Sequence, residues 1–207
     1  MKNDYSSYIN NFFRKWAPFY DLVNLLIFRI REKTFHFVNP EKGSKILDVC
    51  TGTGKQAFAF GKRGFDVVGI DLSEDMLRIA KKRNGYDNVY FIMADASNLP
   101  CKQNYFDISC ISFGLHEMPN SVRERVLKEM IRVTKAEGKV VIVDYAPPKS
   151  KIRFFFLYHF VSLYESKYFS EFVKTDLQDT IKKVRLNLKE SCHLFFGRVK
   201  ISKCEKV

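Results

Sequence analysis

The segment from Lys45 to Asp71 constrains the fold of this chain most strongly. An apolar run over residues 46–49 stops at a glycine-containing stretch, a helix-like segment follows, and a second apolar run over residues 67–70 ends on Asp71. This order of strand, glycine turn, helix, strand and terminal acid is that of a βαβ unit. In such a unit the glycines let the backbone approach a ligand, and the acid can bind ribose hydroxyls. The segment therefore predicts a site for an adenosine-containing molecule.

The rest of the chain continues this alternation of strands and helices. Further strands are expected over residues 89–93, 106–112 and 140–143, and helices over residues 56–62, 73–82, 121–134, 154–164 and 176–186. A helical region over residues 8–37, interrupted at Pro18, precedes the first strand, and a hairpin over residues 191–204 turns at Gly197-Arg198. The pattern predicts an α/β protein: a mostly parallel seven-stranded sheet, an antiparallel C-terminal hairpin and helices on both faces.

The size and charge of the chain bound its organisation. At 207 residues, a single domain is expected, made of an N-terminal helical lid (1–40), a ligand-binding core (41–147) and aromatic, basic helices with the hairpin (148–207). The net charge is +12, and residues 151–207 carry 12 basic and 6 acidic residues, which is half of the excess. This charge predicts either a solvated basic face or attraction to an anionic partner.

The cysteines and the hydropathy pattern suggest a cytoplasmic protein. The five cysteines include no CxxC pair, which argues against a disulfide framework and against a metal site. The first residues are polar where a signal peptide needs an apolar core. No apolar run approaches the roughly 20 residues of a spanning helix.

Three features indicate which adenosine compound is bound. Asp48 stands just before the glycines, where its charge would repel a pyrophosphate but would suit an ammonium and a sulfonium. Asp95 follows the third strand, where a carboxylate can accept from an adenine amino group. The segment 106–114 places a strand and a glycine turn where a methyl donor would lie. S-adenosylmethionine has both positive groups.

Together these elements resemble a class I S-adenosylmethionine-dependent methyltransferase over roughly residues 12–146. Within that class the chain is most similar to the ubiquinone/menaquinone biosynthesis C-methyltransferase (UbiE-like) family, whose Tyr-Asp-x-x-Asn element appears as residues 20–24 and whose Ile-Ser-Phe-Gly-Leu-Arg-Asn turn appears as residues 111–117. The chain departs from that turn at its last two positions, where His116 and Glu117 replace Arg and Asn. The resemblance implies a Rossmann-like methyltransferase fold with an N-terminal helical lid.

The resemblance also implies a set of donor-binding residues. Asp48 would anchor the methionyl end, Asp71 would take both ribose hydroxyls, and Asp95 would bind the adenine amino group. The full set implied for S-adenosylmethionine, and for its product S-adenosylhomocysteine, is Tyr20, Asp48, Cys50, Thr51, Gly52, Thr53, Gly54, Asp71, Leu72, Met76, Asp95, Ala96, Ser112 and Phe113.

The acceptor is expected to be a small molecule, quinol-like or lipid-like, methylated by in-line transfer that gains most from alignment and exclusion of water. His116, Tyr145 and Tyr20 are the candidate catalytic residues, and His116 is the first candidate for a general base. Two alternatives stay open. A nucleic-acid methyltransferase is disfavoured, because Asn/Asp-Pro-Pro-Tyr is absent after the fourth strand. A donor-binding module without catalysis would also fit the changes at residues 116 and 117.

The segment from Lys149 to Phe160 joins basic residues to a run of aromatic rings. It predicts either a helix packed on the sheet with a solvated basic end, or an amphipathic segment that touches lipid. The second interpretation predicts a cytoplasmic protein that makes weak contact with an anionic membrane surface.

Overall fold

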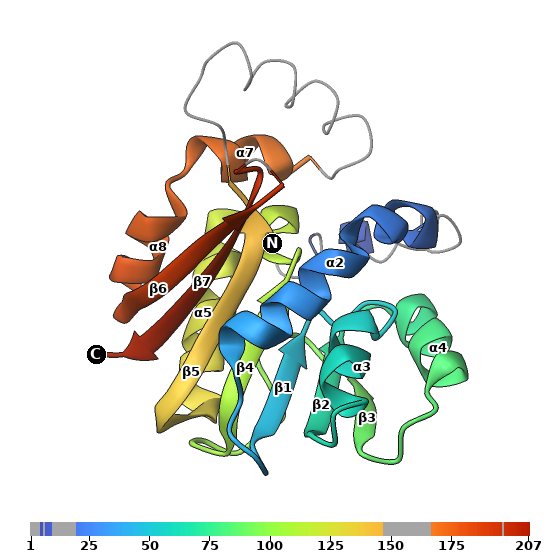
Figure 1. Cartoon of the computed structure of the whole chain (residues 1–207). Coiled ribbons are helices and arrows are strands. Elements are labelled where there is room, and N and C mark those ends of the chain that lie inside the picture. Colours follow the sequence, from blue (N-terminus) through green and yellow to red (C-terminus); the bar gives the residue numbers. More distant parts are fainter. Residues whose placement is uncertain (1–4, 6, 10–19, 147–166, 196) are drawn as a thin grey trace.

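The computed structural model describes residues 5, 7–9, 20–146, 167–195 and 197–207, with the side chains of residues 20–28 left out. Seven strands form one sheet in the order β3-β2-β1-β4-β5-β7-β6 (Figure 1). The strands are β1 (Lys45–Val49), β2 (Asp66–Asp71), β3 (Val89–Met93), β4 (Phe106–Ser112), β5 (Thr134–Tyr145), β6 (Leu186–Leu194) and β7 (Val199–Lys206). The helices are α2 (Tyr20–Val38), α3 (Lys55–Gly61), α4 (Glu74–Arg83), α5 (Asn120–Val133), α7 (Phe169–Lys174) and α8 (Leu177–Lys183), with the 3-10 helix η1 (Leu115–Glu117).

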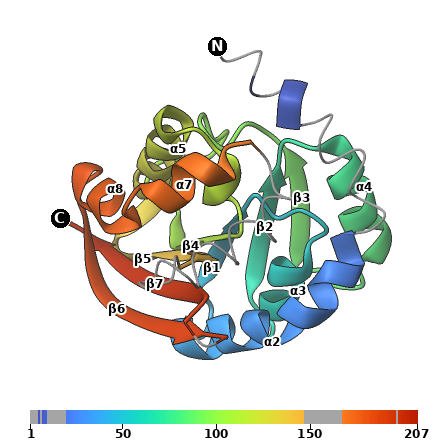
Figure 2. The same ribbon diagram turned by 90° about the horizontal axis from the view of Figure 1, so that it is seen from above.

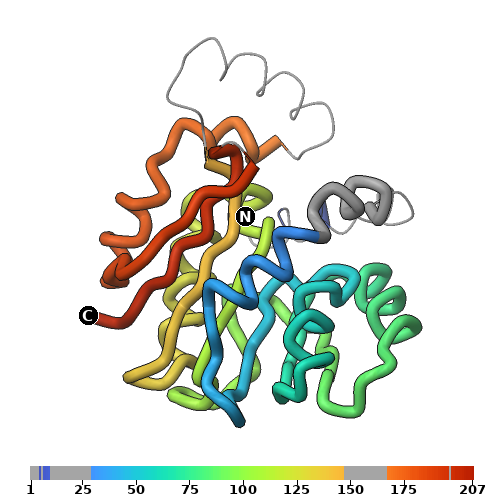
Figure 3. Tube along the Cα trace, in the orientation of Figure 1, coloured from blue at the N-terminus to red at the C-terminus, as the bar shows by residue number. Residues whose placement is uncertain are grey.

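The pairing of the strands confirms the predicted fold class. Strands β1 to β5 pair in parallel, whereas β7 pairs antiparallel with both β5 and β6. Figure 3 follows the C-terminal chain as it returns to lie between β5 and β6. The sheet is therefore mostly parallel with an antiparallel C-terminal hairpin.

Helices cover both faces of the sheet, with α2 and α3 on one side and α5, α7 and α8 on the other (Figure 2). Neighbouring strand residues alternate between the two cores that result, as the period of two requires. In β5, Val140 and Ile142 pack with α5, while Val141 and Val143 face the core that contains Ile30 of α2. Burial on both faces explains why the central strands are continuous apolar runs.

Several predicted boundaries are wrong, and the structure gives the reasons. Strand β5 begins at Thr134 and not at residue 140 as predicted, because Thr134 already pairs with Phe106 ahead of a register shift. The helix expected to reach residue 186 ends at Lys183, since Arg185 adopts a left-handed φ of 62° that no helix continues. The hairpin joins Leu194 to Val199 through four residues, not two.

Helix α7 was not predicted. The predicted interruption at Pro18 and the predicted helix over residues 154–164 lie outside the described residues. Within the described parts of the chain, no helix combines the length and the hydropathy needed to cross a bilayer.

Candidate functional site

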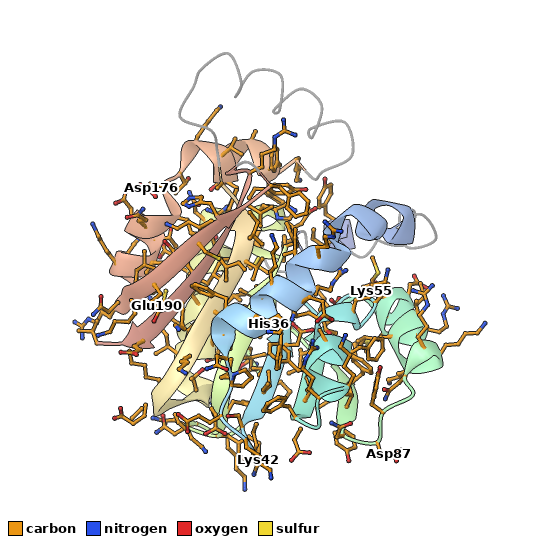
Figure 4. The ribbon with its side chains drawn as sticks, viewed as in Figure 1. His36, Lys42, Lys55, Asp87, Asp176 and Glu190 are labelled. Carbon is orange, nitrogen blue, oxygen red and sulfur yellow. The ribbon has the colours of Figure 1, made fainter. Side chains whose placement is uncertain are left out.

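A cleft with about 670 Å³ of empty space opens at the carboxyl ends of the parallel strands, which is where α/β sheets bind ligands. Figure 4 shows Lys55 near this end of the sheet and Lys42 and Asp87 at the opposite end. The cleft is lined by Tyr5, Ile9, Cys50, Gly52, Asp71, Leu72, Met76, Ala94, Asp95, Ala96, Phe113, Gly114, Glu117, Met118, Val122 and Val126.

Two strained turns shape the floor of the cleft. Cys50 directly follows β1 and Phe113 directly follows β4, and each has a left-handed φ of 55°, which is uncommon outside glycine and typical of functional sites. Gly52 also has a positive φ, of 54°, and a Cβ placed on it would meet no atom within 4 Å. The backbone at Gly52 therefore leaves open the space that a ligand could fill.

Asp71 ends β2 and connects the glycine turn to helix α4. Its Oδ2 accepts a hydrogen bond from the Gly52 N–H at 2.8 Å, and its Oδ1 accepts one from the Ser73 N–H at 2.9 Å. Burial raises the pKa of Asp71, against the opposing effect of these N–H groups. Each oxygen keeps a lone pair for a further donor, so the carboxylate can bind two neighbouring hydroxyls.

Asp48 lies beneath the turn and does not line the cleft. Thr51 donates its hydroxyl to Asp48 Oδ2 at 2.6 Å, while Oδ1 makes no hydrogen bond among the described residues. Burial raises the pKa of Asp48 to about 7, opposed by the Thr51 hydrogen bond and by the charge of Arg31. A cationic ligand above the turn would favour the ionised carboxylate.

Asp95 lies two residues beyond the end of β3 and lines the cleft. Its Oδ1 accepts a hydrogen bond from the Ser97 N–H at 2.8 Å, which orients the side chain. The Ala94 N–H donates to the Asp71 backbone oxygen at 3.0 Å. This bond brings Asp71 and Asp95 to the same wall of the cleft, as the parallel register of β2 and β3 requires.

His116 lies behind the cleft wall, at 3% exposure, and is not among the lining residues. Its Nδ1 is 2.7 Å from Asp144 Oδ1, and its Nε2 is 3.4 Å from Glu117 Oε1. The rings of Phe113, Tyr145, Phe169 and Phe172 surround the imidazole, with centroids 4.9 to 6.4 Å away. His116 and Tyr145 therefore face each other in a buried cluster, and Glu117 is the member of the 116–117 pair that reaches the cleft.

Sequence reasoning missed Tyr5 and Ile9, which line the cleft from the N-terminal segment. Tyr5 stacks edge-on against Tyr168 at 5.7 Å, and Tyr8 does so at 5.6 Å. Lys167 donates its backbone N–H to the Tyr8 hydroxyl at 3.1 Å. These contacts join the start of the chain to helix α7 across a sequence separation that no local pattern reveals.

The structure brings most of the expected donor-binding residues together. Those that line the cleft are Cys50, Gly52, Asp71, Leu72, Met76, Asp95, Ala96 and Phe113. Five others are not among the lining residues: Asp48, Thr51, Thr53, Gly54 and Ser112. The side chain of Tyr20 lies outside the described residues. Six further lining residues were also missed: Ala94, Gly114, Glu117, Met118, Val122 and Val126.

Similar proteins of known structure share this fold. A methyltransferase from Haloferax volcanii, solved in complex with the Trm112 methyltransferase activator, superposes with a TM-score of 0.77 over 95% of this chain and 96% of its own, at 14% identity. A SAM-dependent methyltransferase from Aquifex aeolicus gives a TM-score of 0.67 over 84% of this chain and 88% of its own, at 19% identity. At these identities the likeness is one of fold.

Sequence relatives define the family more closely. A demethylmenaquinone methyltransferase from Paenarthrobacter aurescens is 38% identical over 137 residues, which are 64% of this chain and 53% of that protein. A demethylmenaquinone methyltransferase from Bacillus licheniformis is 34% identical over 179 residues, 80% of this chain and 76% of that protein. This chain thus spans about half the length of the first of these relatives.

A family model matches residues 1–190 and describes the ubiE/COQ5 methyltransferase family. The match covers the glycine turn, Asp71 at the end of β2, Asp95 after β3 and the turn after β4, all of which contribute to the cleft. It confirms the expected class, that of S-adenosylmethionine-dependent methyltransferases. The chain belongs to the ubiE/COQ5 methyltransferase family.

Proposed function

We propose that this protein transfers a methyl group from S-adenosylmethionine to a small lipophilic acceptor of quinol type. One observation carries the proposal: a single cleft has an acidic, glycine-bordered half formed by Gly52, Asp71 and Asp95, and an apolar half formed by residues such as Met118 and Val122. The first half suits an adenosine with a charged amino acid, and the second suits a greasy ring. Phe113 and Gly114, in the turn after β4, line the same cleft.

The residues of the acidic half fit the donor. Asp71 would bind the ribose hydroxyls, Leu72 and Met76 would flank the adenine, and Asp95 would accept from the adenine amino group. Asp48, held by Thr51, would act on the methionyl end through its charge. When bound, S-adenosylmethionine supplies an electrophilic methyl group on a sulfonium, and the protein contributes by orienting it and excluding water.

The relatives support the choice of acceptor. Two proteins that match this chain at 34–38% identity are named demethylmenaquinone methyltransferases, and a ubiquinone/menaquinone biosynthesis C-methyltransferase from Rickettsia prowazekii is 35% identical over 158 residues, 70% of this chain and 63% of that protein. A reduced naphthoquinone that lacks the ring methyl group is therefore the acceptor to test first.

Donor binding can be tested with Asp71→Ala. S-adenosylhomocysteine at about 100 times its dissociation constant should stabilise the wild-type protein by about 2.7 kcal/mol, and the variant should lose most of this gain because no carboxylate remains for the ribose. Thermal unfolding with and without the ligand measures the effect. Asp66→Ala is the matched control, since Asp66 is exposed at the other end of the same strand.

Methyl transfer is tested separately with a labelled donor and a reduced, short-chain prenyl naphthoquinone. Label in the organic extract is the expected result. Stabilisation by a nicotinamide dinucleotide in place of S-adenosylhomocysteine would contradict the proposed donor. Label in RNA, with none in the quinol, would contradict the proposed acceptor.

A further inference from the structure

His116 and Glu117 occupy the two positions at which the family's turn has Arg and Asn. The structure places these two side chains in different surroundings. Glu117 lines the cleft at 5% exposure, whereas His116 is buried behind it. A carboxylate in an otherwise apolar part of a cleft costs free energy unless other groups stabilise it. The surroundings of Glu117 therefore show what this carboxylate can do.

Asp144 anchors the chain of groups that leads to Glu117. Its Oδ2 accepts from the backbone N–H groups of Leu115 and His116 at 3.0 and 3.3 Å, and its Oδ1 accepts from the Tyr145 N–H at 2.8 Å. A carboxylate with N–H donors on both oxygens is a fixed acceptor. His116 Nδ1, 2.7 Å from Oδ1, is therefore the donor of that bond, which directs Nε2 toward Glu117.

The imidazole lies between two carboxylates, since its Nε2 is 3.4 Å from Glu117 Oε1. Two neighbouring carboxylates favour the protonated form of an imidazole, which burial opposes, and a protonated imidazole would in turn favour an ionised Glu117. Arg123, at 1% exposure, adds a second positive charge near Asp144. Two basic side chains, His116 and Arg123, therefore lie near the two acidic side chains Glu117 and Asp144.

Further ionisable groups near this cluster come from the N-terminal segment and from α7, and Glu124 on α5 acts on Arg123. Tyr5 from the N-terminal segment feels the charges of Glu117 and Asp71, and its burial, with these charges, raises the pKa of its phenol. Tyr5 therefore stays protonated and can donate a hydrogen bond. Glu171 from α7 acts on Arg123 and holds the Asn120 N–H at 3.0 Å, so it stabilises the start of α5.

We propose that Glu117 is the group that takes a proton from the acceptor hydroxyl, and that His116 and Asp144 are positioning residues that hold its carboxylate ionised at the cleft wall. This inference rests on the proposed function. The proposed base is therefore the Glu117 side chain, which reaches the cleft, and not the His116 imidazole that the sequence predicted. It also requires an acceptor with an acidic O–H beside the carbon that is methylated.

The proposed step conserves atoms and electrons. The hydroxyl proton moves to a Glu117 oxygen, the O–H electron pair becomes a carbonyl bond, and a ring π pair bonds the neighbouring carbon to the methyl carbon. The pair of the broken sulfur–methyl bond stays on sulfur, which becomes neutral. The hydrogen on the methylated carbon then leaves as a proton, and the carbonyl oxygen regains its proton from Glu117, so that one proton is released in all.

The test compares E117Q with E124Q, using label transfer to the reduced short-chain naphthoquinone. Glu124 lies on α5 and pairs with Lys183 at the surface, so E124Q makes the same chemical change away from the cleft and should keep the wild-type rate. E117Q should lose about 10²–10⁴-fold in kcat, the usual contribution of a general base. Its stabilisation by S-adenosylhomocysteine should equal that of the wild type.

His116→Asn adds a readout that a purely structural role would not change. Without the imidazolium, Glu117 should take up a proton more readily, so the acidic limb of the kcat/KM profile should move to higher pH by about 1–3 units. The profile of E124Q should match the wild type.

Other outcomes would overturn the inference. Wild-type kcat and KM in E117Q would show that Glu117 is dispensable. A raised KM with unchanged kcat would show that Glu117 only binds the acceptor. Loss of the donor-induced stabilisation would show that Glu117 only supports the fold. An unmoved pH profile in His116→Asn would remove the role of His116. A wild-type protein that binds the donor but methylates no quinol would instead contradict the proposed function itself.

Discussion

Asp48 is 1% exposed, and among the described side chains its carboxyl group accepts a hydrogen bond from Thr51. Burial raises its pKa to about 7, compared with about 3.9 in an unfolded chain. The folded protein therefore keeps a proton over a pH range in which the unfolded chain has released it. Asp48, which is expected to help bind the ligand, thus lowers the free energy of unfolding of the ligand-free protein at neutral pH.

Asp48→Asn should show this cost. Between about pH 4 and pH 7, wild-type stability contributed by Asp48 falls as the pH rises, by up to about 1.4 kcal/mol per pH unit, because the unfolded state binds fewer protons. The variant has no carboxyl group to titrate, so its advantage over the wild type should be absent below about pH 4 and largest above about pH 7. Urea unfolding across this range measures the difference, with Asp66→Asn as an exposed control. A constant difference at all pH values would contradict the assignment.

At the scale of elements, helix α3 packs closely against strand β3 at its last residue. A Cβ placed on Gly61 would lie 2.2 Å from Cγ2 of Val89, far inside van der Waals contact. Helix α3 starts at the glycine turn and leads to β2, so its position supports the cleft. The absence of a side chain at Gly61 therefore sets how close the helix approaches the sheet.

Gly61→Ala should destabilise the protein although alanine favours helix. The helical gain is about 1 kcal/mol, whereas forcing a methyl group into a packed site typically costs about 1–3 kcal/mol and displaces the neighbouring element. Gly85→Ala is the matched control, because a Cβ there would meet nothing within 4 Å. Denaturant unfolding compares the two. Greater stability of Gly61→Ala than of Gly85→Ala would show that α3 is not held against β3 in this way.

At the scale of the whole molecule, the excess of positive charge is the property that the cleft does not explain. The chain has 35 basic and 23 acidic residues, while the cleft wall carries Asp71, Asp95 and Glu117. We propose that the charge draws the protein to an anionic membrane surface, where a lipophilic acceptor would be found. The proposed division into lid, core and C-terminal region stays a prediction.

Binding to vesicles tests this proposal. The protein should float with phosphatidylglycerol vesicles at about 0.01 M salt, where the screening length is about 30 Å, and should be released at about 1 M salt, where it is about 3 Å. Phosphatidylcholine vesicles are the control and should not bind it. Equal binding to both kinds of vesicle, or none to the anionic ones at low salt, would contradict an electrostatic contact.

The sequence by itself determined the fold class and the acidic half of the cleft. The glycine turn, Asp71 and Asp95 lie at the ends of three successive parallel strands, whose carboxyl ends meet at one edge of the sheet. Local spacing was enough for these residues. It was not enough for strand β5 or for helix α7, whose limits depend on pairing and packing with distant segments.

Only the tertiary structure decided the other half of the cleft. His116 and Glu117 are neighbours in the chain, yet one is buried against Asp144 and the other lines the cleft, because the short helix η1 turns consecutive side chains in different directions. Tyr5 reaches the same cleft through contacts with Tyr168. Such placements arise from contacts between residues far apart in the chain, which no spacing or composition encodes.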